Sequence, residues 1–404
     1  MTGASIAPKA AAPRIASEAE AILAAREVAR SIAPGVIQRD RTGELPVEAL
    51  AAFDDSGLLG ITVPREDGGA DVSMSTLAEV IRTVAAVDPA IAQVPQAHFL
   101  MVDVLSVWGS QQQRRLLLGE VLAGGRLANA LAERGGRHAQ DLQTRLRGGR
   151  RLDGRKYYCT GALTSAWIAV SALDDEDRVV LAFVPREAPG VALSEDWDTM
   201  GQRATVSGSA VFSDVDVDPD LVIPYQEAFE VPQQLGARAQ LVHAAIQVGI
   251  AGGALRDARE FVRTRARPFF EAQRAGWADT AGEDPHTITR FGRLATRVRA
   301  AEALLADAAA IQQEIGRRPA DELAAARGSI AIAQAKTFAS EAAVEVASDL
   351  FSLTGASAAD ERHDLSRHWR NARTHASHDP VDWKYHHVGN FLLNDALPPN
   401  HGQL

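Results

Sequence analysis

Three long Ala-rich segments near the C-terminal end constrain the fold of this chain more than any other feature. They run over Ala237–Arg265, Thr289–Ile315 and Ala320–Phe351. Helices of this length bury their apolar faces against one another, and small alanine side chains let neighbouring helices approach closely. Gly355 follows the last segment, where glycine suits a helix stop. The sequence therefore predicts a C-terminal helical bundle, interrupted by a loop over Arg267–Pro285.

The N-terminal part is also predicted to be helical. Ser17 and Glu20 have the spacing of a capping box, and apolar residues follow at helical spacing. Further helices are predicted over Pro46–Phe53, with proline at the first helical position, and over Met74–Val87.

The middle of the chain has a different pattern, with short apolar runs between Gly, Pro and Asp clusters. Val179–Val184 and Ser209–Phe212 are examples, and they indicate β-strands. Asp153-Gly154 predicts a hairpin turn, and the spacing of the strands favours a compact antiparallel barrel. The predicted fold is therefore mainly α with a central β-barrel: an N-terminal helical domain at 1–126, a middle β-barrel domain at 127–232 and a C-terminal helical bundle at 233–404.

Charge and cysteine content exclude several classes of protein. The formal net charge is -10 over 404 residues and the basic residues are scattered, so nucleic acid is not an expected partner. Cys159 is the single cysteine, which excludes an internal disulfide and a multi-cysteine metal cluster and fits a reducing cytoplasm.

No membrane association is expected either. Residues 1–14 lack a continuous apolar run, so no export signal is predicted. The least charged stretch, Ala239–Leu255, is interrupted by polar residues and is too short to span a bilayer. It is interpreted as a buried helix of a cytoplasmic protein.

A histidine-rich C-terminal region leaves a metal site open as an alternative. Seven of the eleven histidines lie between His363 and His401, and His375-x-x-His378 with Asp379 has metal-ligand spacing. No second carboxylate cluster accompanies this string, so no metal is predicted. Gly249-Ile-Ala-Gly252-Gly253 does not match a dinucleotide fingerprint, which means that electrons come from the substrate or from another protein.

The order of helices, sheet and helices, together with four local strings, resembles the acyl-CoA dehydrogenase superfamily. The strings are Gly57–Ile61 with Pro64, Leu131-Ala-Glu133, Tyr158-Cys-Thr-Gly161 and Arg265-Ala-Arg267. A dehydrogenase of this family needs a carboxylate base to remove a proton from an acyl thioester. The C-terminal base position carries Arg373 to Pro380 here, and the alternative helix position carries Ala239, so fatty-acid oxidation is disfavoured.

Four further strings, two of them C-terminal, resemble one branch of that superfamily more closely. Trp369–His375, Trp383–Asn390, Pro95–His98 and Glu133–His138 are similar to dibenzothiophene monooxygenase and to sulfur-acquisition oxidoreductases of dimethyl sulfone use. The resemblance implies FMN, supplied reduced by a separate flavin reductase, with FAD as the alternative. It also implies O2 and a small-molecule substrate as partners, and a homotetramer.

The same resemblance implies a set of site residues. The predicted catalytic residues are His98, Cys159 and His378. The predicted cofactor-binding residues are Asn129, Cys159, Thr160, Trp197, Arg265, His375 and His378. Cys159 departs from the serine that is usual in relatives, and Ala356-Ser357 stands where an arginine is expected, which leaves the phosphate grip to Arg265.

The predicted function is that of a two-component, FMNH2-dependent monooxygenase that forms a flavin C4a-hydroperoxide and oxygenates a small substrate, organosulfur compounds being candidates. Such a species survives only where water is excluded, and a histidine near neutrality can move the oxygen-side proton. Two alternatives stay open, namely an FAD-dependent acyl-CoA dehydrogenase with a non-standard base and a non-catalytic flavin-binding protein. Each site residue also has a structural interpretation: His98 as an interior histidine, Asn129 as a cap, and Cys159 and Trp197 as core packing.

Overall fold

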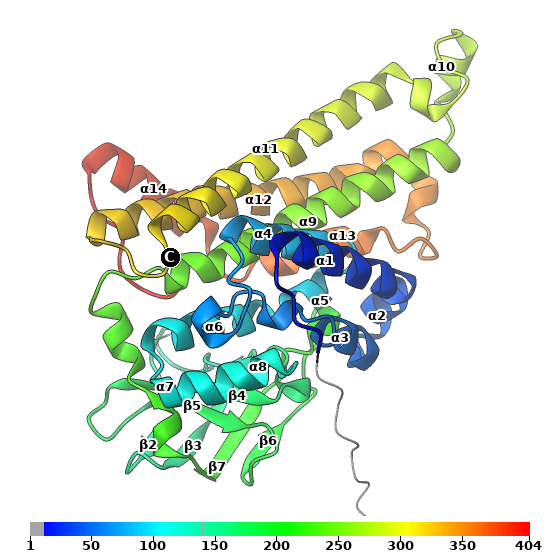
Figure 1. Ribbon diagram of the computed structural model, residues 1–404. Helices are drawn as coiled ribbons and strands as arrows, with labels where there is room; N and C mark the ends of the chain where they lie inside the picture. The colour runs from blue at the N-terminus through cyan, green and yellow to red at the C-terminus, as the bar shows by residue number, and fades with distance from the viewer. Residues whose placement is uncertain (1–11, 139) are drawn as a thin grey trace, which may run out of the picture.

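The computed structural model describes residues 12–138 and 140–404, and it arranges them as helices, sheet and helices in chain order (Figure 1). The long C-terminal helices lie on one side of the molecule, the sheet lies on the other, and N-terminal helices fill the space between them (Figure 1). The prediction that residues 1–14 contain no export signal falls mostly on residues 1–11, which lie outside the described residues.

The N-terminal part is helical, as its pattern predicts. The Ser17 hydroxyl accepts the Glu20 N–H and so begins the first helix, while the Glu20 carboxylate accepts the Ala16 N–H. The α-helices before the sheet are α1 (Glu18–Ile32), α2 (Val36–Thr42), α3 (Val47–Asp54), α4 (Met74–Ala85), α5 (Pro89–Gln93), α6 (Gln96–Trp108), α7 (Gln111–Gln113) and α8 (Gly119–Leu122).

The middle part is one eight-stranded sheet. Its strands are β1 (Leu127–Ala130), β2 (Arg145–Arg147), β3 (Arg151–Lys156), β4 (Trp167–Leu173), β5 (Val179–Pro185), β6 (Val191–Leu193), β7 (Ala210–Asp216) and β8 (Val222–Ile223). Their order is β6-β7-β3-β2-β4-β5-β8, and β1 pairs in parallel with β4.

The predicted closed barrel is wrong, because the sheet is open. Its end strands, β6 with three residues and β8 with two, each pair on one side only within the described residues. Short alternating apolar runs occur in open sheets as well as in barrels, so the pattern could not distinguish them. The hairpin at Asp153-Gly154 is also wrong, because both residues lie inside β3. Gly154 instead marks a register shift against β7, where a Cβ would overlap the Thr144 side chain.

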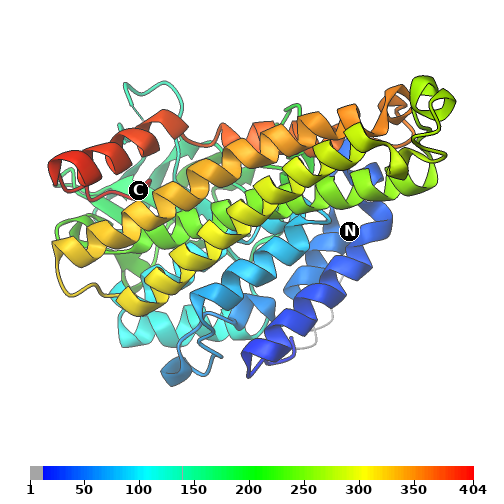
Figure 2. The same ribbon diagram turned by 90° about the horizontal axis from the view of Figure 1, so that it is seen from above.

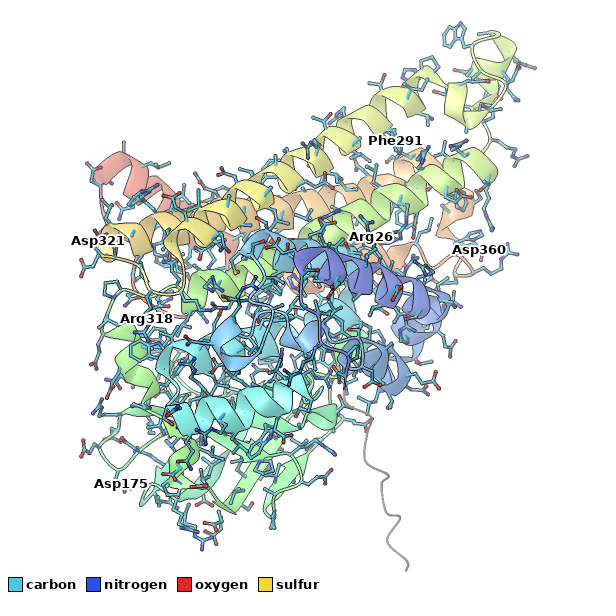
Figure 3. All side chains as sticks on the ribbon, in the orientation of Figure 1. Arg26, Asp175, Phe291, Arg318, Asp321 and Asp360 are labelled. Carbon is cyan, nitrogen blue, oxygen red and sulfur yellow. The ribbon has the colours of Figure 1, made fainter. Side chains whose placement is uncertain are left out.

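The C-terminal part is the predicted bundle. Figure 2 shows its three long helices side by side, and they are α9 (Leu235–Thr264), α11 (Pro285–Ile315) and α12 (Glu322–Thr354). Asp321, the N-cap of α12, and Asp360, beyond its C-terminal end, mark the two ends of this helix in Figure 3. Gly355 caps α12 with φ 74°. Shorter helices complete the bundle: α10 (Phe270–Arg274) inside the predicted loop, α13 (Ser366–Ala376) and α14 (Val381–Asn394).

Two apolar cores support these layers. The larger core joins the helices, and the smaller one lies within the sheet. Residues 239–255 are part of α9 and almost all buried, as predicted. One helical stretch, Pro89–Trp108, is long and apolar enough to cross a membrane by composition, but 78% of its window is buried inside the protein. It is therefore core structure here.

A buried ion network joins the helical layers. The Asp103 carboxylate on α6 accepts two hydrogen bonds from Arg238 on α9, at 2.7 and 3.1 Å. It accepts a third, at 2.9 Å, from Nε of Arg317 in the α11–α12 connection. The pKa of Asp103 would be raised by burial, but the charges of Arg238 and Arg317 outweigh this and lower it. The N-terminal and C-terminal helices are thus tied by paired charges as well as by apolar contact.

Lysine is used in an unusual way in this chain. Lys156, Lys336 and Lys384 are the lysines of the described part, and all three are at most 5% exposed. Each lies in an ion pair with a buried or half-buried carboxylate. The exposed cations of the described surface are therefore guanidinium groups or histidines.

Candidate functional site

Three histidine rings from three segments meet inside the C-terminal bundle. His243 lies on α9, His375 lies on α13, and His378 follows the end of α13. The His243 ring centroid is 5.1 Å from that of His375 and 4.2 Å from that of His378. His375 and His378 are connected by a turn, since α13 ends at Ala376 and the His378 N–H donates to the His375 carbonyl.

The inner two rings of this cluster are held neutral. Burial, the neighbouring His378 and the charge of Lys336 lower the pKa values of His243 and His375 well below their usual range. Nε2 of His375 lies 3.2 Å from Nδ1 of His243 and 3.0 Å from Oε1 of Gln93. His378 differs from both, because its side chain is 46% exposed and can meet a ligand.

A buried carboxylate stands behind His378. Asp379 accepts a hydrogen bond from the Lys336 ammonium and lies 3.0 Å from Nζ of Lys384. Its pKa would be raised by burial, yet the hydrogen bond from His378 and the charges of the two lysines hold it far below its usual range. Because its charge is already paired, this carboxylate is a poor proton acceptor. No group of three or more His, Cys, Asp or Glu side chains placed to hold a metal ion occurs among the described residues.

Polar side chains from the sheet form a second wall. The Thr160 hydroxyl lies 2.7 Å from that of Ser207, which in turn lies 2.8 Å from that of Thr205. Trp197 is half-buried and donates its indole N–H to the Gln202 carbonyl. Asn129 on β1 has a buried Oδ1 with no hydrogen-bond partner. This wall therefore holds an unused acceptor and a chain of hydroxyls.

Two contacts join the sheet wall to the histidine cluster. At the end of α5, Gln93 contacts His375. The next residue, Val94, packs so closely against Gly161 that a Cβ at this glycine would lie only 2.9 Å from the Val94 side chain. In the loop after Trp197, a Cβ on Gly201 would overlap the Arg370 carbonyl of α13. Asn371 of the same helix accepts the Gln202 N–H. One turn of α13 separates these contacts from His375, so both walls border the same region.

Cys159 lies in the core of the sheet. Its side chain is 2% exposed and packs with the smaller apolar core. Burial raises the pKa of its thiol to about 12, so the thiol is neutral at ordinary pH. Its direct neighbour Thr160 carries the hydroxyl that lines the wall.

His98 is buried and uses both ring nitrogens on the backbone. Nε2 donates to the Leu59 carbonyl at 2.9 Å, and Nδ1 accepts the Leu127 N–H at 3.1 Å. Leu127 begins β1, two residues before Asn129. In this arrangement His98 positions the strand that carries Asn129 and has no free nitrogen for a ligand.

We expect this burial to make stability depend on pH. Burial lowers the pKa of His98 to about 4, from an ordinary 6.5 in the unfolded chain. Its contribution is fully present above pH 6.5 and is lost as pH falls toward 4, by about 3 kcal/mol. In urea titrations, the advantage of the wild type over His98→Gln should shrink by that amount between these pH values. A constant difference would contradict the burial of a neutral imidazole.

Arg265 lies far from the histidine cluster within one chain. It follows α9 at the opposite end from His243, and 22 residues of helix correspond to about 33 Å. Its side chain is exposed and lies 3.4 Å from the His363 ring. One flavin mononucleotide is too short to contact both places in the same chain.

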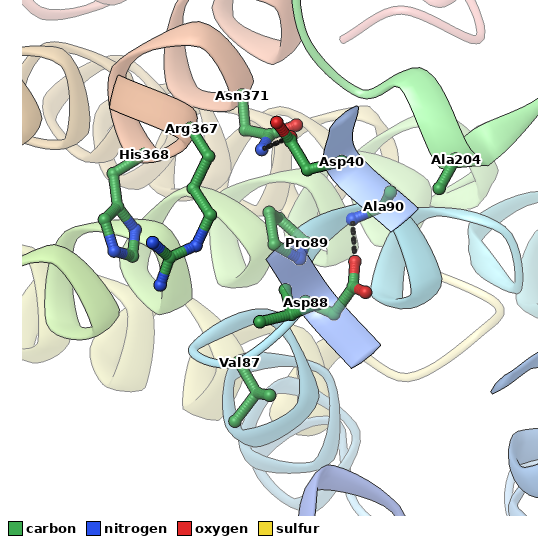
Figure 4. Close-up of a pocket in the computed structure, with 10 residues that line it drawn as sticks. Asp40, Val87, Asp88, Pro89, Ala90, Ala204, Arg367, His368 and Asn371 are labelled. Atoms are coloured by element: carbon green, nitrogen blue, oxygen red, sulfur yellow. Dashed lines mark hydrogen bonds between the residues drawn. The ribbon is translucent and has the colours of Figure 1, made fainter. Parts of the chain in front are cut away.

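A small polar cavity fixes α13 against the N-terminal helices. It measures about 10 Å³ and is lined by residues that include Asp40, Asp88, Arg367, His368 and Asn371. Figure 4 shows Asn371 donating to Asp40 across it, and the Asp88 carboxylate capping the start of α5 at Ala90. The space suffices for roughly one water molecule, so its role is to position α13 and α5.

Sequence reasoning missed three residues of this site: His243, Lys336 and Ser207. The sequence did contain a signal for His243. Polar residues recur at three- and four-residue spacing in the least charged helix, at Gln240, His243 and Gln247. In the structure all three are buried, and they contact Lys336, His375 and the Ala372 carbonyl respectively. A polar stripe on an otherwise apolar helix indicates a polar interior site.

Three family models match successive parts of the chain. They are the N-terminal, middle and C-terminal domains of acyl-CoA dehydrogenase, over residues 18–125, 128–215 and 241–383.

Relatives match over nearly the whole length. The chain is 32% identical to dibenzothiophene monooxygenase from Mycolicibacterium goodii, covering 93% of this chain and 94% of the relative. It is 31% identical to a Pseudomonas putida protein named "Probable FMNH2-dependent monooxygenase SfnC", covering 94% and 96%. The crystal structure of FMN-bound TdsC from Paenibacillus sp. A11-2 superimposes with a TM-score of 0.90 at 30% identity, covering 95% of this chain and all of that one.

Proposed function

The chain belongs to the acyl-CoA dehydrogenase family, and we propose that it is an FMNH2-dependent, two-component monooxygenase of organosulfur compounds that forms a flavin C4a-hydroperoxide. It is a flavin-dependent monooxygenase by its close relatives, and FMN is the cofactor named for the Pseudomonas putida protein and for TdsC. We further propose that a separate flavin reductase supplies the reduced FMN, that O2 is the co-substrate from which the hydroperoxide forms, and that the protein is located in the cytoplasm.

The residues present fit a flavin. Asn129 offers a buried acceptor without a partner, and His375 offers a buried Nδ1 without one. A buried polar atom left unpaired is costly unless a ligand satisfies it. We propose that Asn129, Thr160 and Trp197 hold FMN on the sheet side, with the thiol of the predicted contact Cys159 buried in the core beside Thr160, and that His375 and His378 hold it on the bundle side.

The observation that carries the proposal is the replacement of the carboxylate base by imidazoles. Ala239 occupies the helix position of the base, and the C-terminal position leads to His375 and His378. Asp379, the carboxylate beside them, is already bound by two ammonium groups. A dehydrogenase would need a carboxylate free to take a proton, whereas an oxygenase needs a group that moves an oxygen-side proton.

Reduced FMN would supply oxygen activation, and the chain supplies the remaining requirements. We assign the exclusion of water to the half-buried Trp197 and to the apolar core next to the histidine cluster. His378 is the exposed ring of the cluster, and we assign it the transfer of the proton on the oxygen side. His98 is predicted from the sequence to be catalytic, but both of its ring nitrogens are bound to the backbone, so we assign it a positioning role instead: it holds β1, and thereby Asn129, in place.

The test uses purified protein, FMN, NADH, a flavin reductase and ¹⁸O-labelled O2. Dibenzothiophene, dimethyl sulfone and an alkanesulfinate are offered, and mass spectrometry should detect one labelled oxygen in a sulfur-containing product. Oxygen consumption no faster than that of free reduced FMN, without product, would end the proposal. Anaerobic bleaching of bound flavin by an acyl-CoA would instead support a dehydrogenase.

We also propose a homotetramer, and two features support it. The distance from His243 to Arg265 requires a second copy if Arg265 binds the phosphate of the same FMN. The exposed face of α14 is apolar, with Leu392 and Leu393 66% and 82% exposed beside a groove of about 580 Å³. Exposed apolar faces of this kind are typical of subunit contacts.

A charge on this face should separate the subunits. Leu393→Asp is expected to lower the mass measured by light scattering from four copies to two, because the contact would bury an unpaired carboxylate. Leu23→Asp is the control, since Leu23 is a 57% exposed residue of α1. An unchanged mass for Leu393→Asp would mean that α14 does not form the contact.

A further inference from the structure

Three ion-paired side chains lie behind His378, two from helices and one from the connection between α13 and α14. Lys336 on α12 and Lys384 on α14 both point at Asp379, which lies between α13 and α14. Lys336 and Lys384 are 4% and 5% exposed, and Asp379 is 8% exposed. Two buried ammonium groups against one carboxylate leave an excess of positive charge, which costs free energy to bury.

The two lysines are held differently. Lys336 donates to Oδ1 of Asp379 and also to the Gln240 side chain on α9. Lys384 approaches Oδ2 at 3.0 Å and donates to the Gln403 carbonyl near the C-terminus. Oδ1 is also the oxygen nearest to His378, with Nδ1 at 3.4 Å. Lys336 and His378 therefore share one oxygen atom.

The contact between Nδ1 of His378 and this shared oxygen bears on the tautomer of the ring. A carboxylate that stays ionised can only accept, so the proton of a neutral imidazole facing it must lie on Nδ1. Nε2 then carries the free lone pair and is the nitrogen available to a reacting group. Fixing the tautomer and orientation through a hydrogen bond is how a carboxylate commonly supports a catalytic histidine.

We propose that Lys336 is a positioning residue that, through Asp379, holds His378 as the Nδ1–H tautomer and presents Nε2 to the reacting groups. This rests on the proposed function only in taking His378 as the proton-transfer residue. Lys384 places its charge 3.0 Å from the other oxygen, Oδ2. The charged and titratable groups around His378 are then Lys336, Lys384, Asp379, His243 and His375, from every element packed against it.

The first experiment is nitrogen NMR of histidine-labelled protein without FMN. In the wild type, the His378 signals should show the proton on Nδ1, and assignment uses His378→Ala. In Lys336→Met, Oδ1 of Asp379 loses its ammonium partner, and the carboxylate should turn toward Lys384 and away from His378, which gives a mixture of tautomers. Lys336→Arg should restore the Nδ1–H form. Asp379→Asn should move the proton to Nε2, because the amide can donate where the carboxylate could not. Unchanged tautomers in both Lys336→Met and Asp379→Asn would overturn the proposal.

The second experiment is the pH profile of turnover. Lys336→Met should lower kcat about 10- to 100-fold, by analogy with the loss caused by removing a group that orients a metal-ligating side chain, with little change in KM. In Lys336→Met, the acidic limb of the pH profile should move to higher pH. The charge of Lys336 lowers the pKa values of His243 and His375, so its loss lets both rings take up protons at a higher pH. Lys336→Arg should recover most of the rate and the original limb.

Lys156→Met is the matched control, since Lys156 is equally buried and pairs with Glu133 at 2.7 Å in the sheet. Lys156→Met should change stability but neither the tautomer of His378 nor the acidic limb of the pH profile. If Lys156→Met changed both, the loss of any buried charge would have this effect. Where a methionine variant does not fold, Lys336→Gln replaces it, keeping a donor and removing the charge. Should His378→Ala retain full turnover while the tautomer responds to Lys336, the proton-transfer role of His378 fails and the positioning of its ring stands. Absence of any oxygenated product from the wild type, with the tautomer still responding to Lys336, would end the proposed function alone.

Discussion

His378→Ala is expected to lower the rate of product formation about 10²- to 10⁴-fold, the range typical of a lost general acid–base group. The reason is that His378 is the exposed member of a cluster whose other two rings are buried and held neutral. Consumption of reduced FMN should continue, with hydrogen peroxide replacing the oxygenated product. Stability should change by less than about 1 kcal/mol, since the side chain is partly exposed.

The measurement couples product analysis with a peroxide assay under constant FMNH2 supply. His286→Ala is the control, because His286 is an exposed histidine at the start of α11, away from the α14 face proposed as a subunit contact. That variant should form product at the wild-type rate. If both variants behaved alike, the proton transfer would have to be assigned elsewhere.

Asp103→Ala is expected to destabilise the protein by about 3–5 kcal/mol, the cost typical of removing one partner of a buried ion pair. The carboxylate satisfies Arg238 and Arg317 together, and Asp103 and Arg238 are 5% and 6% exposed. Without it, the buried Arg238 guanidinium loses its carboxylate partner, and Arg317 keeps only its ion pair with Asp71 at 2.9 Å.

Urea unfolding at pH 7 measures this loss, and Glu345→Ala provides the contrast. Glu345 pairs with Arg297 at 2.7 Å, but both side chains are a third or more exposed, so its loss should cost under about 1 kcal/mol. The pKa of Asp103 is depressed in the fold, so its stabilisation is present above about pH 4 and disappears as pH falls through the lower folded value. A variant that loses no more than Glu345→Ala would show that the network is not stabilising.

Much of the fold could be predicted because the three parts of the chain differ in periodicity. Long Ala-rich segments predicted α9, α11 and α12 to within a few residues, and the Ser17 cap predicted the start of α1. The closed barrel and the turn at Asp153-Gly154 were wrong for a shared reason. Strand pairing depends on contacts between distant residues, and a local pattern of apolar and turn residues does not contain them.

The candidate site was predictable only where a string could be aligned. His375, His378 and Thr160 were found in this way and lie on the two walls described above. Lys336 could not be found, because a lysine in an Ala-rich helix normally suggests an exposed face. Its partner is 43 positions away, and only the packing of α12 against the turn after α13 reveals the pair.

The confinement of lysine to buried ion pairs has a practical consequence for anyone who handles this protein. Amine-directed chemistry, whether for surface immobilisation, fluorescent tagging or chemical cross-linking, meets no accessible primary amine on a lysine within residues 12–138 and 140–404. A lysine introduced on the outer face of α11 would therefore become a single, addressable attachment point on this part of the molecule, away from the polar walls between the sheet and the bundle.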